Sequence, residues 1–139
     1  MSDRYLFMMS RIQNRILRHI KGELKKQGLS LSPGQMAVVL ALNETTHALM
    51  GELSRTLDMD SAALTRLVAS LETQGLVSRE INPANRRQIR VSITPEGKRQ
   101  AGILIPIVRN ANDMISRGFS PEEMAVYNRV NQAILDRFE

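Results

Sequence analysis

Apolar residues recur along most of the chain at spacings of three and four positions, the period of a helix with one buried face. The first stretch shows the pattern at Met9, Ile12, Ile16, Ile20 and Leu24. Six helices are predicted: over 4–26, from Ser32, over roughly 50–57, over 61–73, from Thr94 and from Ser120. Pro106 lies inside the fifth helix and is expected to bend it or to relax its hydrogen bonding.

The stretch from 76 to 94 changes to a period of two, which indicates strands. Apolar and polar residues alternate over 89–94, and the letters "INPAN" before them fit a turn in which Pro83 fixes φ. The pattern therefore predicts two strands joined as a hairpin, with Arg86 and Arg87 at its tip. The expected fold class is mainly α with a small β-hairpin.

The size of the chain and the order of these elements favour a single domain over 1–139. Segment 32–94 resembles a winged helix-turn-helix in which the hairpin is the wing, so a DNA-binding lobe is expected over 31–99. The outer helices, 4–26 and 100–138, are too apolar on one side to stand alone. A two-fold dimer is expected to cover them, since a palindromic DNA site requires one.

The amino-acid composition excludes some classes of protein and favours others. Hydrophobic residues make up 42% and charged residues 24%, the balance of a globular protein. Without cysteine, a disulfide and a thiol nucleophile are excluded, and the pattern shows no signal peptide or membrane span, so a cytoplasmic protein is expected. The net charge is +5 and the basic residues concentrate in 1–26 and 79–99, which favours a nucleic-acid partner.

The helix over 61–73 has two different faces. Its buried stripe is expected at Leu64, Leu67, Val68 and Leu71. On the other face, Ala62 is small enough for close approach, Thr65 can contact a base, and Arg66 can donate two hydrogen bonds to a guanine. Ser61 and the N–H groups beside it suit a phosphate. Any surface helix can show small and polar residues outward, but the preceding helix and turn favour recognition of double-stranded DNA.

Arginines on the hairpin complete the candidate surface. Arg86 and Arg87 can reach phosphates or the minor groove, and Arg90 points outward from its strand. The competing interpretation is that these arginines keep the hairpin soluble and discourage edge pairing.

The chain resembles the multiple-antibiotic-resistance regulator (MarR) family in the stretches "LSPGQMAVVLAL", "GELSRTLDMDSAALTRLVASLETQGLVSRE" and "NPANRRQIRVSITPEGK". The resemblance covers about 31–99 closely. It implies a homodimer held by the first and last two helices, a recognition helix in the major groove and a wing in the minor groove. It also implies release of DNA by a small ligand, often an aromatic or phenolic acid. By position, the recognition residues are Ser61, Ala62, Thr65 and Arg66, and the wing arginine is Arg87.

The wing departs from the family at one position. The family usually has Asp-x-Arg there, whereas this chain has Asn85 followed by Arg86 and Arg87. An asparagine can still accept a hydrogen bond but brings no charge, so a less preorganised Arg87 is expected.

The first helix carries Arg11, Arg15 and Arg18 on one stripe. They can hold the carboxylate of a small anionic effector, or they can form a solvated face paired with the acidic residues of the last helix. His19 and Glu23 stand four positions apart, but two side chains do not make a metal site. No metal and no cofactor are expected.

Two other functions compete with DNA binding. An enzyme is disfavoured because the sequence contains no glycine-rich phosphate loop, no cysteine nucleophile and no Ser-His-Asp arrangement. A winged helix that binds protein or RNA would carry acidic or apolar residues on its recognition face, where this chain has Thr65 and Arg66. The sequence therefore predicts a homodimeric transcriptional repressor that binds a pseudo-palindromic operator.

Overall fold

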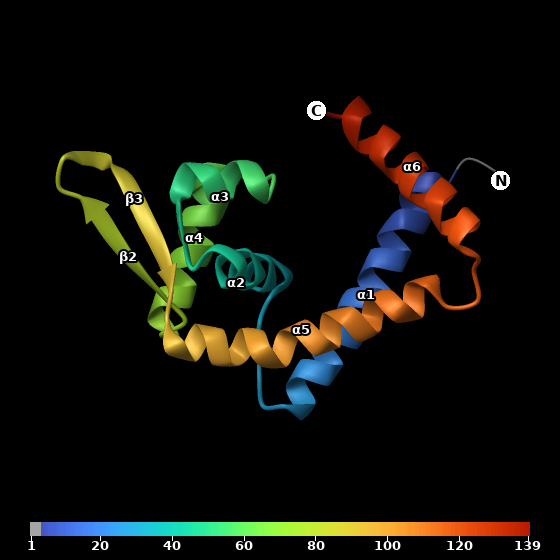
Figure 1. Cartoon of the computed structure of the whole chain (residues 1–139), viewed down its shortest axis with the longest axis horizontal. Coiled ribbons are helices and arrows are strands. Elements are labelled where there is room, and N and C mark those ends of the chain that lie inside the picture. Colours follow the sequence, from blue (N-terminus) through green and yellow to red (C-terminus); the bar gives the residue numbers. More distant parts are fainter. Residues whose placement is uncertain (1–3) are drawn as a thin grey trace.

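A computed structural model describes residues 4–139, in which a hairpin projects at one end and helices extend to the other (Figure 1). The elements are α1 Tyr5–Lys26, α2 Pro33–Thr45, β1 His47–Leu49, α3 Met50–Thr56, α4 Ser61–Thr73, β2 Val77–Asn82, β3 Asn85–Ile93, α5 Pro95–Ser116 and α6 Pro121–Arg137. All six predicted helices are confirmed. None of the helices in the described part is long and apolar enough to cross a membrane.

The longer helices after α1 begin where a side chain can cap them. The capping oxygens of Ser32, Asp60, Thr94 and Ser120 accept a hydrogen bond from the backbone N–H three residues later, at 3.2, 2.8, 3.0 and 3.1 Å. Asp60 therefore caps α4, and Ser61 is the first residue of the helix. Because these contacts are local, the sequence was sufficient to locate the helix starts.

The sheet has three antiparallel strands in the order β1-β3-β2, so the prediction of two strands was incomplete. In the added strand, Ala48 pairs with Val91 and Leu49 pairs with Arg90. Three residues are too short to show a period of two, and only the pairing with β3 makes this segment a strand.

One apolar core lies between α2, α4, the sheet and the first half of α5. Its fully buried members include Val38, Val39, Leu42, Leu64, Val68, Leu71, Leu76, Val91 and Leu104. Gly97 lets α5 lie directly on this core, because a Cβ there would come within 2.2 Å of the Leu76 carbonyl oxygen. The helix-turn-helix and the hairpin are thus fixed to the start of α5.

The second half of α5 leaves this lobe and reaches α1 and α6 (Figure 1). The helix continues through Pro106, so the proline does not end it. Helix α6 has no buried residue, and Val126, Tyr127 and Leu135 are among its exposed apolar side chains. The chain therefore has a packed lobe at one end and a helical arm with an uncovered apolar face at the other.

Candidate nucleic-acid interface

The turn between α3 and α4 sets the angle of the exposed helix. Asp58 adopts a left-handed conformation with φ 51°, and the Ser54 hydroxyl donates to the Met59 carbonyl at 2.5 Å. Behind the turn, Leu53 and Leu64 are buried. This packing holds α4 with its opposite face toward solvent.

The four residues predicted to read DNA on α4 all lie on that exposed face. They are Ser61, Ala62, Thr65 and Arg66. The Thr65 hydroxyl donates to the Ser61 carbonyl at 2.7 Å, which leaves its lone pairs free to accept. No ion pair holds the Arg66 guanidinium within the described part of the chain. The face can therefore offer a free guanidinium beside small side chains.

The wing ends in an irregular turn. Ile81 pairs with Ile89 but Asn82 pairs with Asn85, so residues 86–88 have no partner on β2. The Asn82 amide donates to the Gln88 side-chain oxygen at 2.9 Å and closes this segment. The segment resembles a β-bulge, which redirects side chains at the end of a hairpin.

Asn85 holds the backbone of the wing arginine. Its side-chain oxygen accepts a hydrogen bond from the Arg87 N–H at 3.1 Å, as expected for an asparagine at this position. The contact fixes the backbone of Arg87 and does not involve its guanidinium group.

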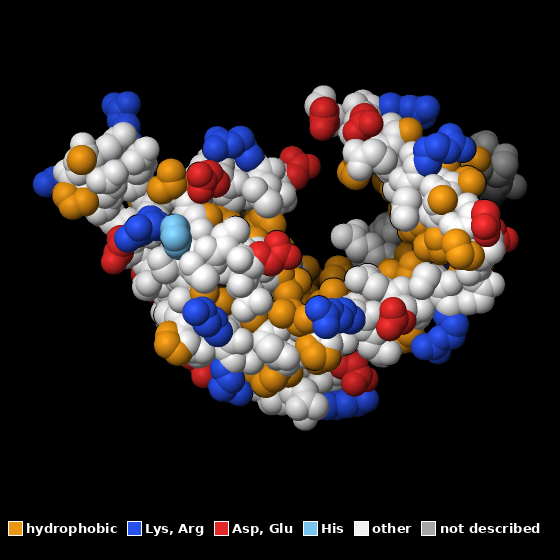
Figure 2. Space-filling view, viewed as in Figure 1, with side chains coloured by type: hydrophobic (Ala, Val, Ile, Leu, Met, Phe, Trp, Pro, Cys, Tyr) orange, Lys and Arg blue, Asp and Glu red, His pale blue; other side chains and the backbone are white. Residues whose placement is uncertain are grey.

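Some basic side chains of the wing form ion pairs with acidic neighbours. Arg90 is 2.6 Å from Glu80 across the two strands, so its guanidinium is less available for a phosphate than the sequence suggested. Arg86 and Arg87 form no ion pair within residues 4–139, and basic side chains stand at the free end of the hairpin in Figure 2. The available cations of the wing are therefore concentrated at its end.

The wing is also tied to α4. The Arg79 guanidinium donates to Glu72 Oε1 from Nη2 at 2.9 Å and from Nε at 3.3 Å, and the Arg79 N–H donates to Oε2 at 3.1 Å. The hydrogen bond from Arg79 lowers the pKa of Glu72 and raises the pKa of Arg79. The contact cancels the acidic charge of Glu72 at the end of α4.

The three arginines predicted to bind an effector have different surroundings. Arg11 lies over the Phe7 ring, with 5.8 Å between the guanidinium carbon and the ring centroid. Arg15 lines a large hollow between α1, α5 and α6, and Arg18 is exposed on α1. None of the three forms an ion pair with α6 in the described part of the chain.

Two basic positions on α1 lie outside the predicted effector-binding set. Lys21 and Lys25 line a second cavity of about 540 Å³ against the start of α2 and the end of α4. Their four-residue spacing was a usable signal, although it does not indicate which element faces them. Among residues 4–139 no group of three metal-binding side chains occurs, and Glu23 pairs with Lys26 at 2.7 Å.

Comparisons with known proteins agree with this geometry. A model of the MarR family matches residues 27–88. The transcriptional repressor YetL of Bacillus subtilis is 25% identical over 134 residues, which cover 95% of this chain and 77% of YetL. The curated relatives are transcriptional regulators and not enzymes.

Two solved structures show the same fold. BpsR of Bordetella bronchiseptica, whose DNA binding is regulated by 6-hydroxynicotinic acid, has a TM-score of 0.83 and 18% identity over 97% of this chain and 95% of BpsR. A variant of Escherichia coli MarR in complex with operator DNA has a TM-score of 0.80 and 20% identity over 92% of this chain and 91% of that protein. The winged helix-turn-helix with flanking helices is thereby confirmed.

Proposed function

Because this chain belongs to the MarR family of DNA-binding transcriptional regulators, we propose that it is a homodimeric repressor of a pseudo-palindromic operator, released by a small anionic aromatic ligand. The observation that carries the proposal is that Arg66 on the exposed face of α4 and Arg86 and Arg87 on the wing are all exposed and form no ion pair within residues 4–139. On this proposal, residues 31–99 read the DNA, while 4–26 and 100–138 join the two copies.

Different parts of the surface contact different parts of the duplex. Thr65 and Arg66 face base edges in the major groove, and Ser61 with the first N–H groups of α4 faces a phosphate. Ala62 lets the helix approach closely. Arg87, with Arg86 beside it, enters the adjacent minor groove or contacts its phosphates; Arg90 has a smaller part because Glu80 already pairs with it. This division assigns base preference to α4 and general affinity to the wing.

Dimerisation is supported by the arm formed by α1, α5 and α6. A helix whose residues are all at least partly exposed, like α6, gains little stability from its own chain. A second copy can bury the apolar faces of both arms under one two-fold axis. The two recognition helices are then expected to read half-sites about one helical turn apart, near 10 base pairs.

Repression and ligand release are proposed from the relatives. YetL is a repressor, and 6-hydroxynicotinic acid, which regulates BpsR, is an aromatic acid. In this chain, Arg15 in the large hollow and the Lys21–Lys25 pair in the second cavity offer the positive charge that a carboxylate needs. Arg11 and Arg18 lie on the same helix and remain secondary candidates.

The test is fluorescence anisotropy of the purified protein with its own upstream DNA and with a scrambled duplex, across a salt series. We expect tight, salt-sensitive binding that prefers the upstream DNA, because phosphate contacts release counterions. Equal binding to both duplexes would contradict a specific regulator of that site. Absence of binding at low salt would favour a protein-contact function instead.

A further inference from the structure

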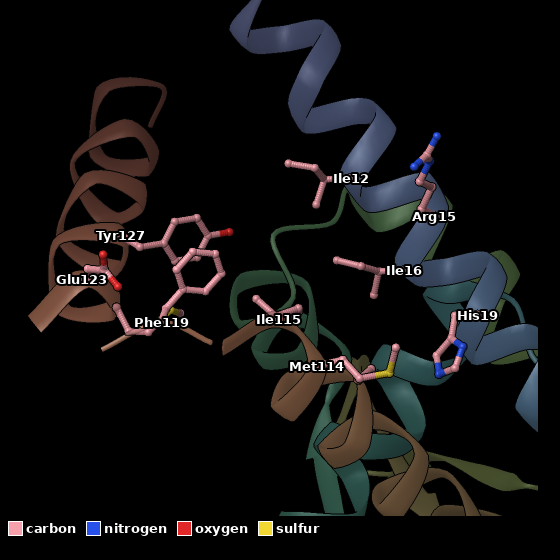
Figure 3. Close-up of a pocket in the computed structure, with 11 residues that line it drawn as sticks. Ile12, Arg15, Ile16, His19, Met114, Ile115, Phe119, Glu123 and Tyr127 are labelled. Carbon is pink, nitrogen blue, oxygen red and sulfur yellow. The ribbon is translucent and has the colours of Figure 1, made fainter. Parts of the chain in front are cut away.

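The second cavity, of about 540 Å³, lies where the arm meets the lobe. The end of α1, residues 29–32, the start of α2 and Gln74, the C-cap residue of α4, form its sides. A cavity of this volume is large enough for a small metabolite. Its lining differs from that of the hollow between α1, α5 and α6, which apolar side chains such as Ile12, Ile115 and Phe119 dominate (Figure 3).

The second cavity carries positive charge without a counter-ion. Lys21 and Lys25 line it from α1, and no aspartate or glutamate of the described chain does so. Neither lysine forms an ion pair or a side-chain hydrogen bond within residues 4–139. The neighbouring Lys26, by contrast, is 2.7 Å from Glu23. Like charges four positions apart on a helix repel each other, so an anion between Lys21 and Lys25 would remove an unfavourable interaction.

The end of α1 does not require these lysines for its own capping. Lysines near a helix C-terminus can satisfy its last carbonyl groups. Here the Leu24 carbonyl accepts the N–H groups of Gln27 and Leu29, at 2.9 and 3.0 Å. The Lys25 carbonyl accepts the Gly28 N–H at 3.0 Å. Because the backbone closes the helix, the two ammonium groups are available to a ligand.

Neutral polar groups complete the lining of the cavity. The Ser30 hydroxyl has no hydrogen-bond partner among the described residues. Gln74 Nε2 is 3.5 Å from Ser70 Oγ, a long contact that a stronger acceptor can replace. Gln35 is only 8% exposed and is held at both ends, since its nitrogen donates to Ser70 at 2.9 Å and its oxygen accepts the Ser32 N–H at 2.9 Å. Ser30 and Gln74 therefore offer two neutral donors beside a fixed wall.

The pair of lysines favours a phosphate group over a carboxylate. An ammonium group binds phosphate as a point charge, whereas planar bidentate pairing with a carboxylate is characteristic of arginine. A phosphate monoester carries close to two negative charges at neutral pH and has three strong acceptor oxygens. It can therefore neutralise both ammonium groups and accept from Ser30 and Gln74. The buried side chains of Leu24, Leu29 and Leu31 line the rest of the cavity and suit the carbon skeleton of such a ligand.

We propose that the second cavity binds a small phosphate monoester between Lys21 and Lys25. The inference deepens the proposed function, because it names the ligand class of this cavity, and it rests on that function for the regulatory meaning of the binding. One ligand that contacts both α1 and Gln74 connects α4 to the arm. The cavity is thus a ligand site separate from the hollow, whose walls suit an aromatic acid.

The test is a titration of isotopically labelled protein with methyl phosphate, followed by amide-resolved NMR at constant ionic strength. We expect saturable shifts of the Ser30, Ser32 and Gln74 signals, and weaker binding of acetate in a parallel titration. Lys21→Ala and Lys25→Ala should each raise the dissociation constant for methyl phosphate roughly tenfold, because each removes one charge-assisted hydrogen bond.

Lys98→Ala is the matched control, since Lys98 is exposed on α5, lines neither cavity and forms no ion pair within residues 4–139. It should leave the dissociation constant unchanged. Equal affinities in all three lysine variants would overturn the inference. Shifts confined to the start of α4 and the wing would also overturn it, because they would place the phosphate on the DNA-binding surface only.

Two further outcomes separate this inference from the proposed function. Acetate that binds as tightly as methyl phosphate would refute the assigned ligand class. A chain that shows the expected shifts but does not bind its upstream DNA would support this site and refute the proposed function. A chain that binds that DNA but shows no shift around the second cavity would refute this site alone.

Discussion

Four glutamates form ion pairs with basic side chains and make these four less available to DNA. Glu23, Glu72, Glu80 and Glu96 pair with Lys26, Arg79, Arg90 and Arg99, each at an N–O distance below 3 Å. Arg66, Arg86 and Arg87 have no such partner within residues 4–139. The charge available to a phosphate is therefore smaller than the composition suggests, and it includes Arg66 on α4 and the two arginines at the end of the wing.

Replacing Arg87 tests the wing. We expect Arg87→Ala to weaken binding to operator DNA and to scrambled DNA by similar factors, because a phosphate contact carries little sequence preference. The slope of log affinity against log salt concentration should fall by about 1 per copy. Anisotropy across a salt series measures both quantities. Arg129→Ala is the matched control, since it removes the same charge from α6; equal losses in the two variants would show a net-charge effect only.

Replacing Arg66 tests base recognition. Arg66→Ala should cost about 1–3 kcal/mol of operator binding and relax the preference at one base pair of each half-site. Binding to a panel of single-base operator variants measures the preference directly. An unchanged ranking of the panel would remove Arg66 from the recognition surface.

At the scale of elements, the start of α5 joins the sheet to the arm. Thr94 caps this helix, and its hydroxyl donates to the Gly75 carbonyl at 2.6 Å while its oxygen accepts the Gly97 N–H. Glu96 and Arg99 pair on the exposed side of the same turn. The cap and the contact with Gly75 thus fix the start of α5 against the end of α4.

Any side chain at position 97 is expected to destabilise the fold. Gly97→Ala should lower the free energy of unfolding by about 1–3 kcal/mol, because the new methyl group would meet the backbone of Leu76. Gly102→Ala is the control in the same helix, where a Cβ meets nothing within 4 Å, and it should be neutral or stabilising by about 1 kcal/mol. Denaturant unfolding measures both, and equal stabilities of the two variants would contradict the close packing.

The Glu96 contacts should appear in the acid stability of the protein. Hydrogen bonds from Arg99 and Gln100 lower the pKa of Glu96 from 4.5 to about 2. A lowered folded pKa gives stability that is present above pH 4.5 and is lost as the pH falls toward 2. The Tm advantage of the wild type over Glu96→Gln should therefore shrink across that range in thermal melts. A difference that stays constant with pH would show that the carboxylate contacts do not stabilise the fold.

At the scale of the whole molecule, one chain offers one winged helix-turn-helix and an arm that its own core does not cover. The arm carries apolar side chains on α1, α5 and α6, including Phe7, Met114 and Val130. Because α5 runs from the lobe into the arm, the way two arms join would set the spacing of the two recognition helices (Figure 1). Dimerisation and operator geometry are therefore expected to be coupled.

A charge on the apolar face of α6 tests this coupling. Val130→Glu should produce monomers in sedimentation velocity, because burying an unpaired carboxylate in the dimer is unfavourable. It should also weaken binding to a full operator much more than binding to a half-site. Asn128→Glu adds the same charge at a position about 200° around the helix from Val130, and it serves as the control. A monomeric Val130→Glu that keeps full operator affinity would refute binding as a dimer.

Sequence alone determined the helices, their caps, the hairpin and which residues of α4 are exposed. Those features depend on local contacts and on the helical or strand period, as at Asp60 and Ala63 or along Leu64, Val68 and Leu71. The family resemblance added the arrangement of lobe and arms, which the solved structures share.

Tertiary structure decided which of the predicted residues are free to act. Strand register brings Glu80 to Arg90, and the end of α4 brings Glu72 to Arg79, contacts that spacing along the chain does not reveal. The strand β1 exists only because β3 pairs with it, and the hollow lined by α1, α5 and α6 exists only because α1 and α6 diverge (Figure 3). Contacts between distant segments depend on how elements pack, and no local pattern records that.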